Sequence, residues 1–186
     1  LAELMVAAQV LKALILLYQD KLESCLKVAR HWLRLVSENQ PVFSASLLCI
    51  QAAAYTLLGE VDEGVKSIAR ARQYLSQSAN TYLLVVTSLI EALVCKEAGD
   101  LLHGSQVADE TRARVKKVYG MDSRVVEPLT LVSADLLYER NEHAQIIDKL
   151  PDAITWRDVA TPIELISRGK LVMARAYFYA GDTDKG

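Results

Sequence analysis

The feature that most constrains this chain is a short pattern that recurs five times, about forty residues apart. Each copy ends in a residue typical of a tight turn, and an alanine stands seven positions before it. The five turn residues are Asp20, Gly59, Gly99, Asn141 and Gly181, and their alanines are Ala13, Ala52, Ala92, Ala134 and Ala174. A repeat period in this range is typical of a helical solenoid.

Apolar residues around each turn recur with the period of a helix. The positions ten, seven and four before each turn fall on one helical face, because residues three apart are neighbours on a helix. The predicted helix pairs are 2–19 with 22–36, 41–58 with 62–77, 81–98 with 102–118, and 124–140 with 143–150, followed by one more helix that ends near residue 180. Residues 1–186 are therefore predicted to be a single all-α domain, a right-handed superhelix of about five antiparallel helix pairs.

Local signals refine two of these helix starts. Pro128 either starts its helix late or kinks it near the beginning. The last helix has the clearest start, because Thr161, Pro162 and Glu164 offer a hydroxyl cap, a proline in the first turn and a capping-box glutamate.

Small residues at fixed places in the repeat predict close contact between helices. Each alanine is expected where the two helices of a pair cross, so a larger side chain there should cost about 1–3 kcal/mol by overpacking. Glycine also stands five residues after three of the turns, at Gly64, Gly104 and Gly186. Because glycine inside a helix is unfavourable, its use there suggests that a neighbouring helix approaches the backbone closely.

Composition excludes several classes of partner. The net charge is −2, so the overall balance favours neither nucleic acid nor an anionic membrane surface. Apolar runs are interrupted by charges well before the roughly 20 residues that a membrane span needs. The three cysteines, Cys25, Cys49 and Cys95, stand at apolar helical positions without paired spacing. They are expected to be reduced core residues, which indicates a cytoplasmic protein.

No motif in the chain predicts catalysis, a metal or a bound cofactor. The segment Gly59–Ser67 approaches a phosphate-binding loop, but it follows an alanine-rich helix rather than a strand, and Val65 displaces the lysine by one position. His103 and His143 each follow a turn without a second ligand at metal spacing. Nucleophiles, bases and carboxylates form no catalytic pattern, so the chain is not expected to be an enzyme.

The small residue, the following aromatic residue and the turn glycine resemble the tetratricopeptide pattern, with a period longer than that family's 34 residues. More specifically, Leu136–Glu142 after Ala134, and Ala174–Asp182, resemble the sensor region of MalT-like, LuxR-type transcriptional activators. The resemblance implies an ATP-binding module before the repeats and a helix-turn-helix module after them. Contact with DNA would then be made only through that missing module, and ATP would bind outside this chain.

The inner face of such a superhelix is a candidate ligand site. Positions two, three and six before the last two turns place acids, an arginine and aromatic rings on that face. We predict that Asp135, Tyr138, Arg175 and Tyr179 contribute to a groove for a small-molecule inducer. The alternative is a solvated face whose charged side chains form ion pairs between helices.

Two functions are compatible with these observations. The first is inducer sensing and self-association within an ATP-dependent LuxR/MalT-type activator, whose other domains would be its partners. The second is a stand-alone tetratricopeptide scaffold that binds a peptide or protein. The chain starts at Leu1, and Gly181–Gly186 repeats the turn of Gly59–Gly64 without the helix that follows there. We therefore expect a piece of a longer protein, able to self-associate through an uncovered face.

Overall fold

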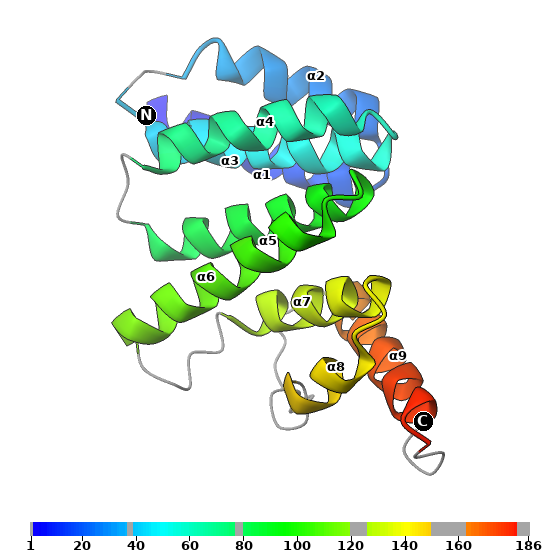
Figure 1. The fold of residues 1–186 in the computed structure, drawn as a ribbon. Helices are drawn as coiled ribbons and strands as arrows, with labels where there is room; N and C mark the ends of the chain where they lie inside the picture. The colour runs from blue at the N-terminus through cyan, green and yellow to red at the C-terminus, as the bar shows by residue number, and fades with distance from the viewer. Residues whose placement is uncertain (1, 37–38, 77–79, 120–125, 150–162, 182–186) are drawn as a thin grey trace. The chain divides into compact units, whose positions relative to one another are not determined.

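The computed structural model describes residues 2–36, 39–76, 80–119, 126–149 and 163–181, and this part of the chain is entirely helical (Figure 1). The chain divides into two compact units, Leu1–Ala98 and Gly99–Gly186. The first unit contains α1 (Ala2–Tyr18), α2 (Leu22–Leu33), α3 (Pro41–Leu57), α4 (Val61–Leu75) and α5 (Thr81–Glu97). The second contains α6 (Leu101–Tyr119), α7 (Glu127–Glu139), α8 (His143–Lys149) and α9 (Ile163–Tyr179).

The five turn residues share one backbone conformation. Asp20 and Asn141 have φ values of 57° and 65°, and the three turn glycines have values between 79° and 83°. At three of these turns the amide of the next residue returns to the helix: Lys21 N donates to Leu16 O, Glu60 N to Tyr55 O and Glu142 N to Leu137 O, each at 2.9 Å. This is the Schellman pattern of helix ends, which requires a positive φ that glycine, asparagine and aspartate tolerate best.

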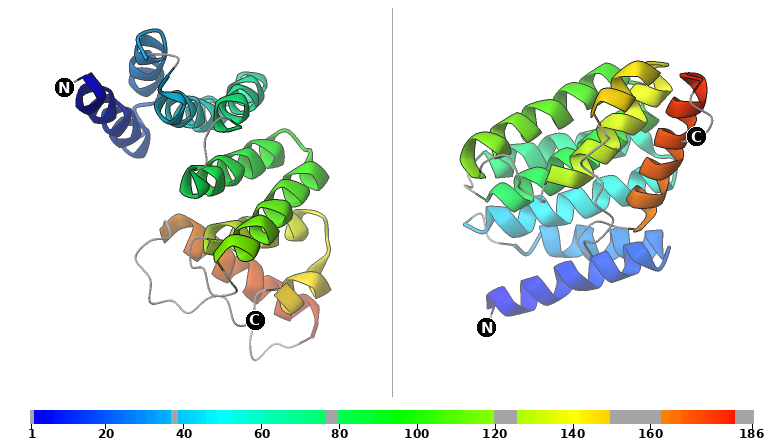
Figure 2. Two further views of the ribbon diagram at one scale, coloured as in Figure 1. Left: turned by 90° about the vertical axis from the view of Figure 1, so that its left-hand side faces the viewer. Right: turned by 90° about the horizontal axis from the view of Figure 1, so that it is seen from below.

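Helix α3 is the centre of the first unit, because it packs against α1, α2, α4 and α5. Figure 2 shows it between α2 and α4 when these helices are viewed along their axes. Two faces of α3 are buried: Leu47, Ile50 and Ala54 lie in the core shared with α1 and α2, while Leu48 and Ala52 lie in the core shared with α4 and α5. Burial on both sides explains why α3 is apolar almost all round.

The repeated small residues of the first unit lie at close contacts. Ala13, Ala52 and Ala92 are fully buried. A Cβ atom on Gly64 would lie 2.7 Å from Thr56 Oγ1 and 3.3 Å from Ala52 O, so α4 approaches the backbone of α3 closely, as expected. Gly104 is buried in α6, and Gly186 lies outside the described residues.

The second unit is organised around α7, which packs against α6, α8 and α9. Its core includes Leu131, Ala134, Leu137 and Ile146. The fifth copy of the repeat departs from the expected pattern, because Leu171 is 50% exposed and Ala174 is only half-buried. The face of α9 that meets α7 and α8 instead carries Val172 and Ala176.

The remaining helix predictions have clear outcomes. Helix α7 begins at Glu127 with Pro128 in its first turn, so the late start is confirmed and the kink is not needed. The capping residues Thr161 and Pro162 lie outside the described residues.

All three cysteines are buried and free. Burial raises the pKa of Cys25 and of Cys49 to about 11.

Neither a membrane-spanning helix nor a metal-binding cluster is present among the described residues. None of their helices combines the length and the apolar character needed to cross a membrane. The same residues contain no group of three or more His, Cys, Asp or Glu side chains placed to hold a metal ion.

Candidate functional site

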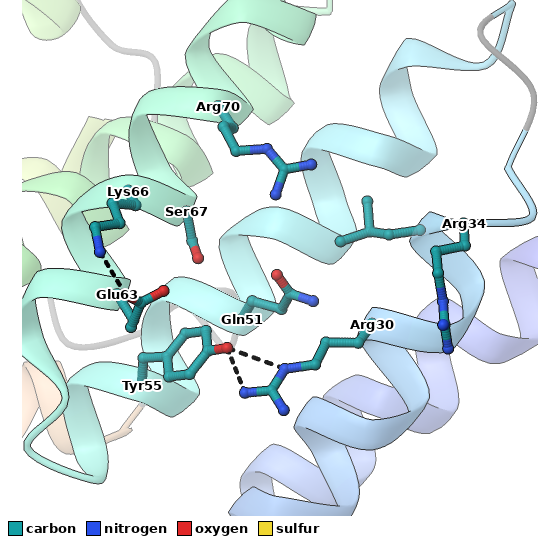
Figure 3. Close-up of a pocket in the computed structure, with 9 residues that line it drawn as sticks. Arg30, Arg34, Gln51, Tyr55, Glu63, Lys66, Ser67 and Arg70 are labelled. Carbon is teal, nitrogen blue, oxygen red and sulfur yellow. Dashed lines mark hydrogen bonds and ion pairs between the residues drawn. The ribbon is translucent and has the colours of Figure 1, made fainter.

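A pocket of about 390 Å³ lies in the first unit, between α2 and α4 and above α3 (Figure 3). We call it the cationic pocket. Its lining residues come from three segments: Arg30, Leu33 and Arg34 from the end of α2, Gln51 and Tyr55 from α3, and Glu63, Lys66, Ser67 and Arg70 from α4. On both outer helices the basic residues are spaced four apart, which places each pair on one helical face. Because α2 and α4 both pack on α3, these two basic faces border the same space.

The floor of the pocket is polar and buried. Gln51 and Ser67 are only 4% and 6% exposed, and neither side chain has a hydrogen-bond partner among the described residues. Figure 3 shows the amide of Gln51 directed into the space between Arg30 and Arg70. Although both residues are mostly buried, their polar atoms are open to the pocket and are not enclosed in the core. These two groups are therefore available to a molecule that occupies the pocket.

Tyr55 orients one of the cations. Arg30 Nε donates to the Tyr55 hydroxyl at 3.0 Å, and Arg30 Nη2 donates to the same oxygen. The guanidinium also lies over the Tyr55 ring, with its Cζ 5.2 Å from the ring centroid. Both contacts are with a neutral side chain, so the positive charge of Arg30 is held in place but not neutralised.

Positive charge dominates the lining. The single carboxylate, Glu63, accepts a hydrogen bond of 2.6 Å from Lys66 Nζ, and this contact raises the pKa of the Lys66 ammonium. Arg34 and Arg70 have no ion-pair or hydrogen-bond partner for their side chains within the described ranges. Four cations and one carboxylate thus surround the pocket in a chain whose net charge is −2. The resulting potential favours an anion.

Three of the four residues predicted from the sequence meet in the second unit, together with His143. Arg175 Nη1 donates to the Tyr138 hydroxyl at 3.4 Å, and Arg175 Cζ lies 5.4 Å from the centroid of the Tyr138 ring. The His143 ring is stacked on Tyr179 at 4.4 Å and lies 5.4 Å from Tyr138. We call these four residues the aromatic cluster. Their rings and charge are turned toward one another, which ties α7, α8 and α9 together.

Asp135 makes a different contact. Its carboxylate side chain is 5% exposed and accepts a hydrogen bond of 2.8 Å from Arg168 Nε. This ion pair joins α7 to α9, which is the kind of contact that the alternative interpretation of the inner face described. Asp135 is thus placed in helix packing, while Tyr138, Arg175 and Tyr179 are placed in the aromatic cluster.

Sequence reasoning missed both the cationic pocket and the part played by His143. The signal for the pocket was present, because Arg30 with Arg34 and Lys66 with Arg70 each have the spacing of one helical turn. What the sequence did not reveal is that these two faces border one space. From the sequence, His143 is only a histidine that follows a turn, whereas in the structure its ring stacks on Tyr179 and lies near Tyr138.

Comparisons with known proteins give no further guidance. No family model matches the chain, and no curated protein or solved structure matches it. The two arrangements of side chains described above are therefore the basis for a functional proposal.

Proposed function

We propose that this chain is a non-catalytic sensing domain that binds a small molecule in the cationic pocket. The observation that carries the proposal is the pair of polar groups on Gln51 and Ser67, which line a pocket of about 390 Å³ and have no hydrogen-bond partner among the described residues. A concave site with an apolar wall and a few convergent polar groups is what small-molecule binding requires. Leu33 supplies apolar surface beside these groups.

The position of the pocket suggests how occupancy would be transmitted. Its lining residues belong to three helices, and the middle one, α3, contacts every other helix of the first unit. A ligand that contacts α2, α3 and α4 together would stabilise those conformations of the unit in which the three helices lie at the distances that the ligand requires. Binding would thereby shift the population of the unit's conformations, which is the physical basis of a sensor.

The resemblance to MalT-like regulators extends this proposal. In such a protein the sensing domain would control an ATP-binding module and a helix-turn-helix module outside this chain, and self-association would accompany sensing. The amino-acid sequence of the complete protein tests this extension directly. A phosphate-binding loop before the repeats and a helix-turn-helix after them would support it, and the absence of both would favour a stand-alone scaffold that binds a peptide.

A thermal-shift screen of metabolites tests the binding proposal itself. A ligand at about 100 times its dissociation constant should raise the free energy of unfolding by about 2.7 kcal/mol. The variant Gln51→Leu removes the pocket amide with little change in volume, so it should fold normally and lose the response.

The double variant Tyr138→Ala and Arg175→Ala is the matched comparison in the second unit. It should keep the response, because these residues lie in the aromatic cluster and not in the pocket. If this variant abolishes the response while Gln51→Leu retains it, the ligand binds at the face predicted from the sequence and the cationic pocket is not the sensing site. If only peptides bind, and Gln51→Leu leaves them unaffected, the scaffold function replaces the sensor.

A further inference from the structure

We infer that the ligand of the cationic pocket carries a phosphate group together with neutral hydroxyl groups. This inference rests on the proposed function, because it identifies the chemical class of the molecule that the same pocket would bind. The geometry that carries it is the placement of guanidinium groups on both sides of one polar floor.

Phosphate fits this arrangement better than a carboxylate does. A carboxylate presents two oxygens in one plane, and a single arginine can satisfy both of them. Here the uncompensated cations stand on two different helices, with Arg30 on α2 and Arg70 on α4, and Figure 3 shows Gln51 between them. A tetrahedral group with three terminal oxygens and nearly two negative charges can be contacted from both helices at once.

The neutral groups of the floor specify the rest of the ligand. The Ser67 hydroxyl can donate one hydrogen bond and accept others, and the Gln51 amide can both donate and accept. Both side chains are buried and lack described partners. Groups of this kind complement hydroxyl groups, which also donate and accept. The ligand class is therefore a phosphate monoester of a hydroxyl-bearing small molecule.

Glu63 sets the orientation of the phosphate. It is the one carboxylate in the lining, and it is bonded to Lys66 at one end of the pocket. An anion near Glu63 would be repelled, whereas Arg30 and Arg70 border the space beside Gln51 without a carboxylate partner among the described residues. The phosphate is thus expected between Arg30 and Arg70. The hydroxyl-bearing part would then extend toward Ser67 and Glu63.

The experiment uses three small probes of similar size on the purified chain. Glycerol 3-phosphate carries the proposed chemistry, glycerol lacks the phosphate, and malate carries two carboxylates and a hydroxyl. Binding is measured by calorimetry and thermal shift, with probes at about 10 mM so that even a dissociation constant near 1 mM is detected. We expect glycerol 3-phosphate to bind, malate to bind at least about tenfold more weakly, and glycerol not to bind.

Three charge variants locate the phosphate. Arg70→Gln should weaken glycerol 3-phosphate about tenfold or more, because it removes one charge-assisted contact. Glu63→Gln should strengthen it, because it removes the only like charge in the lining. Lys27→Gln changes the chain's net charge by the same amount as Arg70→Gln and lies on α2 outside the pocket lining, so it should leave the affinity unchanged. Raising the salt concentration should weaken binding to the wild type.

Each contrary result has a distinct meaning. Equal binding of malate and glycerol 3-phosphate would overturn the choice of phosphate and leave the sensing function intact. The same holds if glycerol 3-phosphate does not bind, while a neutral metabolite binds in a way that Gln51→Leu abolishes and Arg70→Gln does not affect. Equal effects of Lys27→Gln and Arg70→Gln would show that only overall charge matters and would overturn the proposed site. If no molecule responds to Gln51→Leu, the proposed function itself is wrong.

Discussion

The cationic pocket of the first unit and the aromatic cluster of the second both pair an arginine with a tyrosine, Arg30 with Tyr55 and Arg175 with Tyr138, but they differ in their other polar groups. In the second unit Arg175 bonds to Tyr138, and His143 stacks on Tyr179, so each group finds its partner within the protein. In the first unit the guanidinium of Arg70, the amide of Gln51 and the hydroxyl of Ser67 face an open space instead.

This difference distinguishes polar groups that stabilise the fold from polar groups that can bind a ligand. A polar group paired inside the protein contributes to the free energy of folding and has little left to offer a ligand. A polar group held beside a cavity without a partner contributes little to folding and can bind a molecule that enters. In the first unit, polar groups without a partner among the described residues border the pocket, whereas in the second unit the predicted site residues contact one another, His143 or Arg168.

The largest expected effect concerns the modification rate of the cysteines in the first unit, which reports how well the interior of that unit excludes solvent. All three cysteines belong to the first unit, so thiol chemistry reports on that unit alone. Cys25 and Cys49 are buried, and desolvation raises the pKa of each to about 11. At pH 8 the thiolate fraction should then be about a hundredfold smaller than for a thiol with a pKa near 9, and modification by a disulfide reagent should be slowed at least as much.

The modification rate of the two cysteines should also depend on pH in a defined direction. Because burial favours the neutral thiol, the folded protein keeps its proton up to a higher pH than the unfolded chain does. The modification rate of Cys25 and Cys49 in the folded protein should still rise about tenfold per pH unit between pH 9 and 10, whereas in urea it should level off near pH 9. Mass spectrometry of the labelled peptides assigns the sites. Rapid labelling at pH 8 would mean that solvent reaches the two cores of the first unit that contain Cys25 and Cys49.

How much of this could be predicted from the sequence depends on whether the signal is local. The all-helical architecture and most helix ends were predicted, because turn residues, capping patterns and apolar spacing act within a few residues. The prediction for α2 was too long at its end: the helix stops at Leu33 and not at residue 36. The superhelical arrangement of the pairs stays a prediction.

The sites depend on contacts between distant residues, which a single sequence does not reveal. Arg168 lies 33 positions from Asp135, and no periodicity connects them, although they form an ion pair. The apolar face of α9 was misplaced for a related reason. The repeat pattern identified Leu171 and Ala174 as the apolar face. In the structure, Val172 and Ala176 of α9 instead pack against α7 and α8.

The next largest effect should come from removing one cation from each unit. Arg168→Met removes the ion pair that Arg168 forms with the buried carboxylate of Asp135, so the free energy of unfolding should fall by about 2 kcal/mol. This value lies below that for a fully buried pair because the Arg168 side chain is 47% exposed. Arg70→Met, the same substitution in the pocket, should change stability by less than about 0.5 kcal/mol, since Arg70 has no described partner to lose.

Urea unfolding followed by far-ultraviolet circular dichroism measures both variants. A loss of stability in Arg70→Met as large as that in Arg168→Met would mean that the pocket cations support the fold, and the contrast between the two units would be wrong. A gain in stability in Arg70→Met would strengthen the contrast, because it would show mutual repulsion among the unneutralised cations of the pocket.

The smallest effect tests whether stacking holds the aromatic cluster together. The rings of His143 and Tyr179 are parallel to within 7°, and His143 Nε2 also lies 2.9 Å from Asn141 Oδ1. The other ring nitrogen, Nδ1, is buried and has no partner in the described part of the chain. His143→Ala should lower the free energy of unfolding by about 1 kcal/mol, as expected for the loss of an aromatic pair. His103→Ala, at an exposed position in the same unit, is the matched control and should have less than half that effect.

Replacement of His143 by phenylalanine separates stacking from hydrogen bonding. His143→Phe keeps a ring on Tyr179 and removes the unpartnered Nδ1, whose burial is unfavourable, so stability should equal or exceed that of the wild type. If His143→Phe is instead as unstable as His143→Ala, the hydrogen bond to Asn141 is the important contact, because both variants lose it. Asn141 is the turn residue with positive φ between α7 and α8. In that case the cluster would stabilise the second unit by fixing the turn, and its aromatic surface would be free to bind a ligand after all.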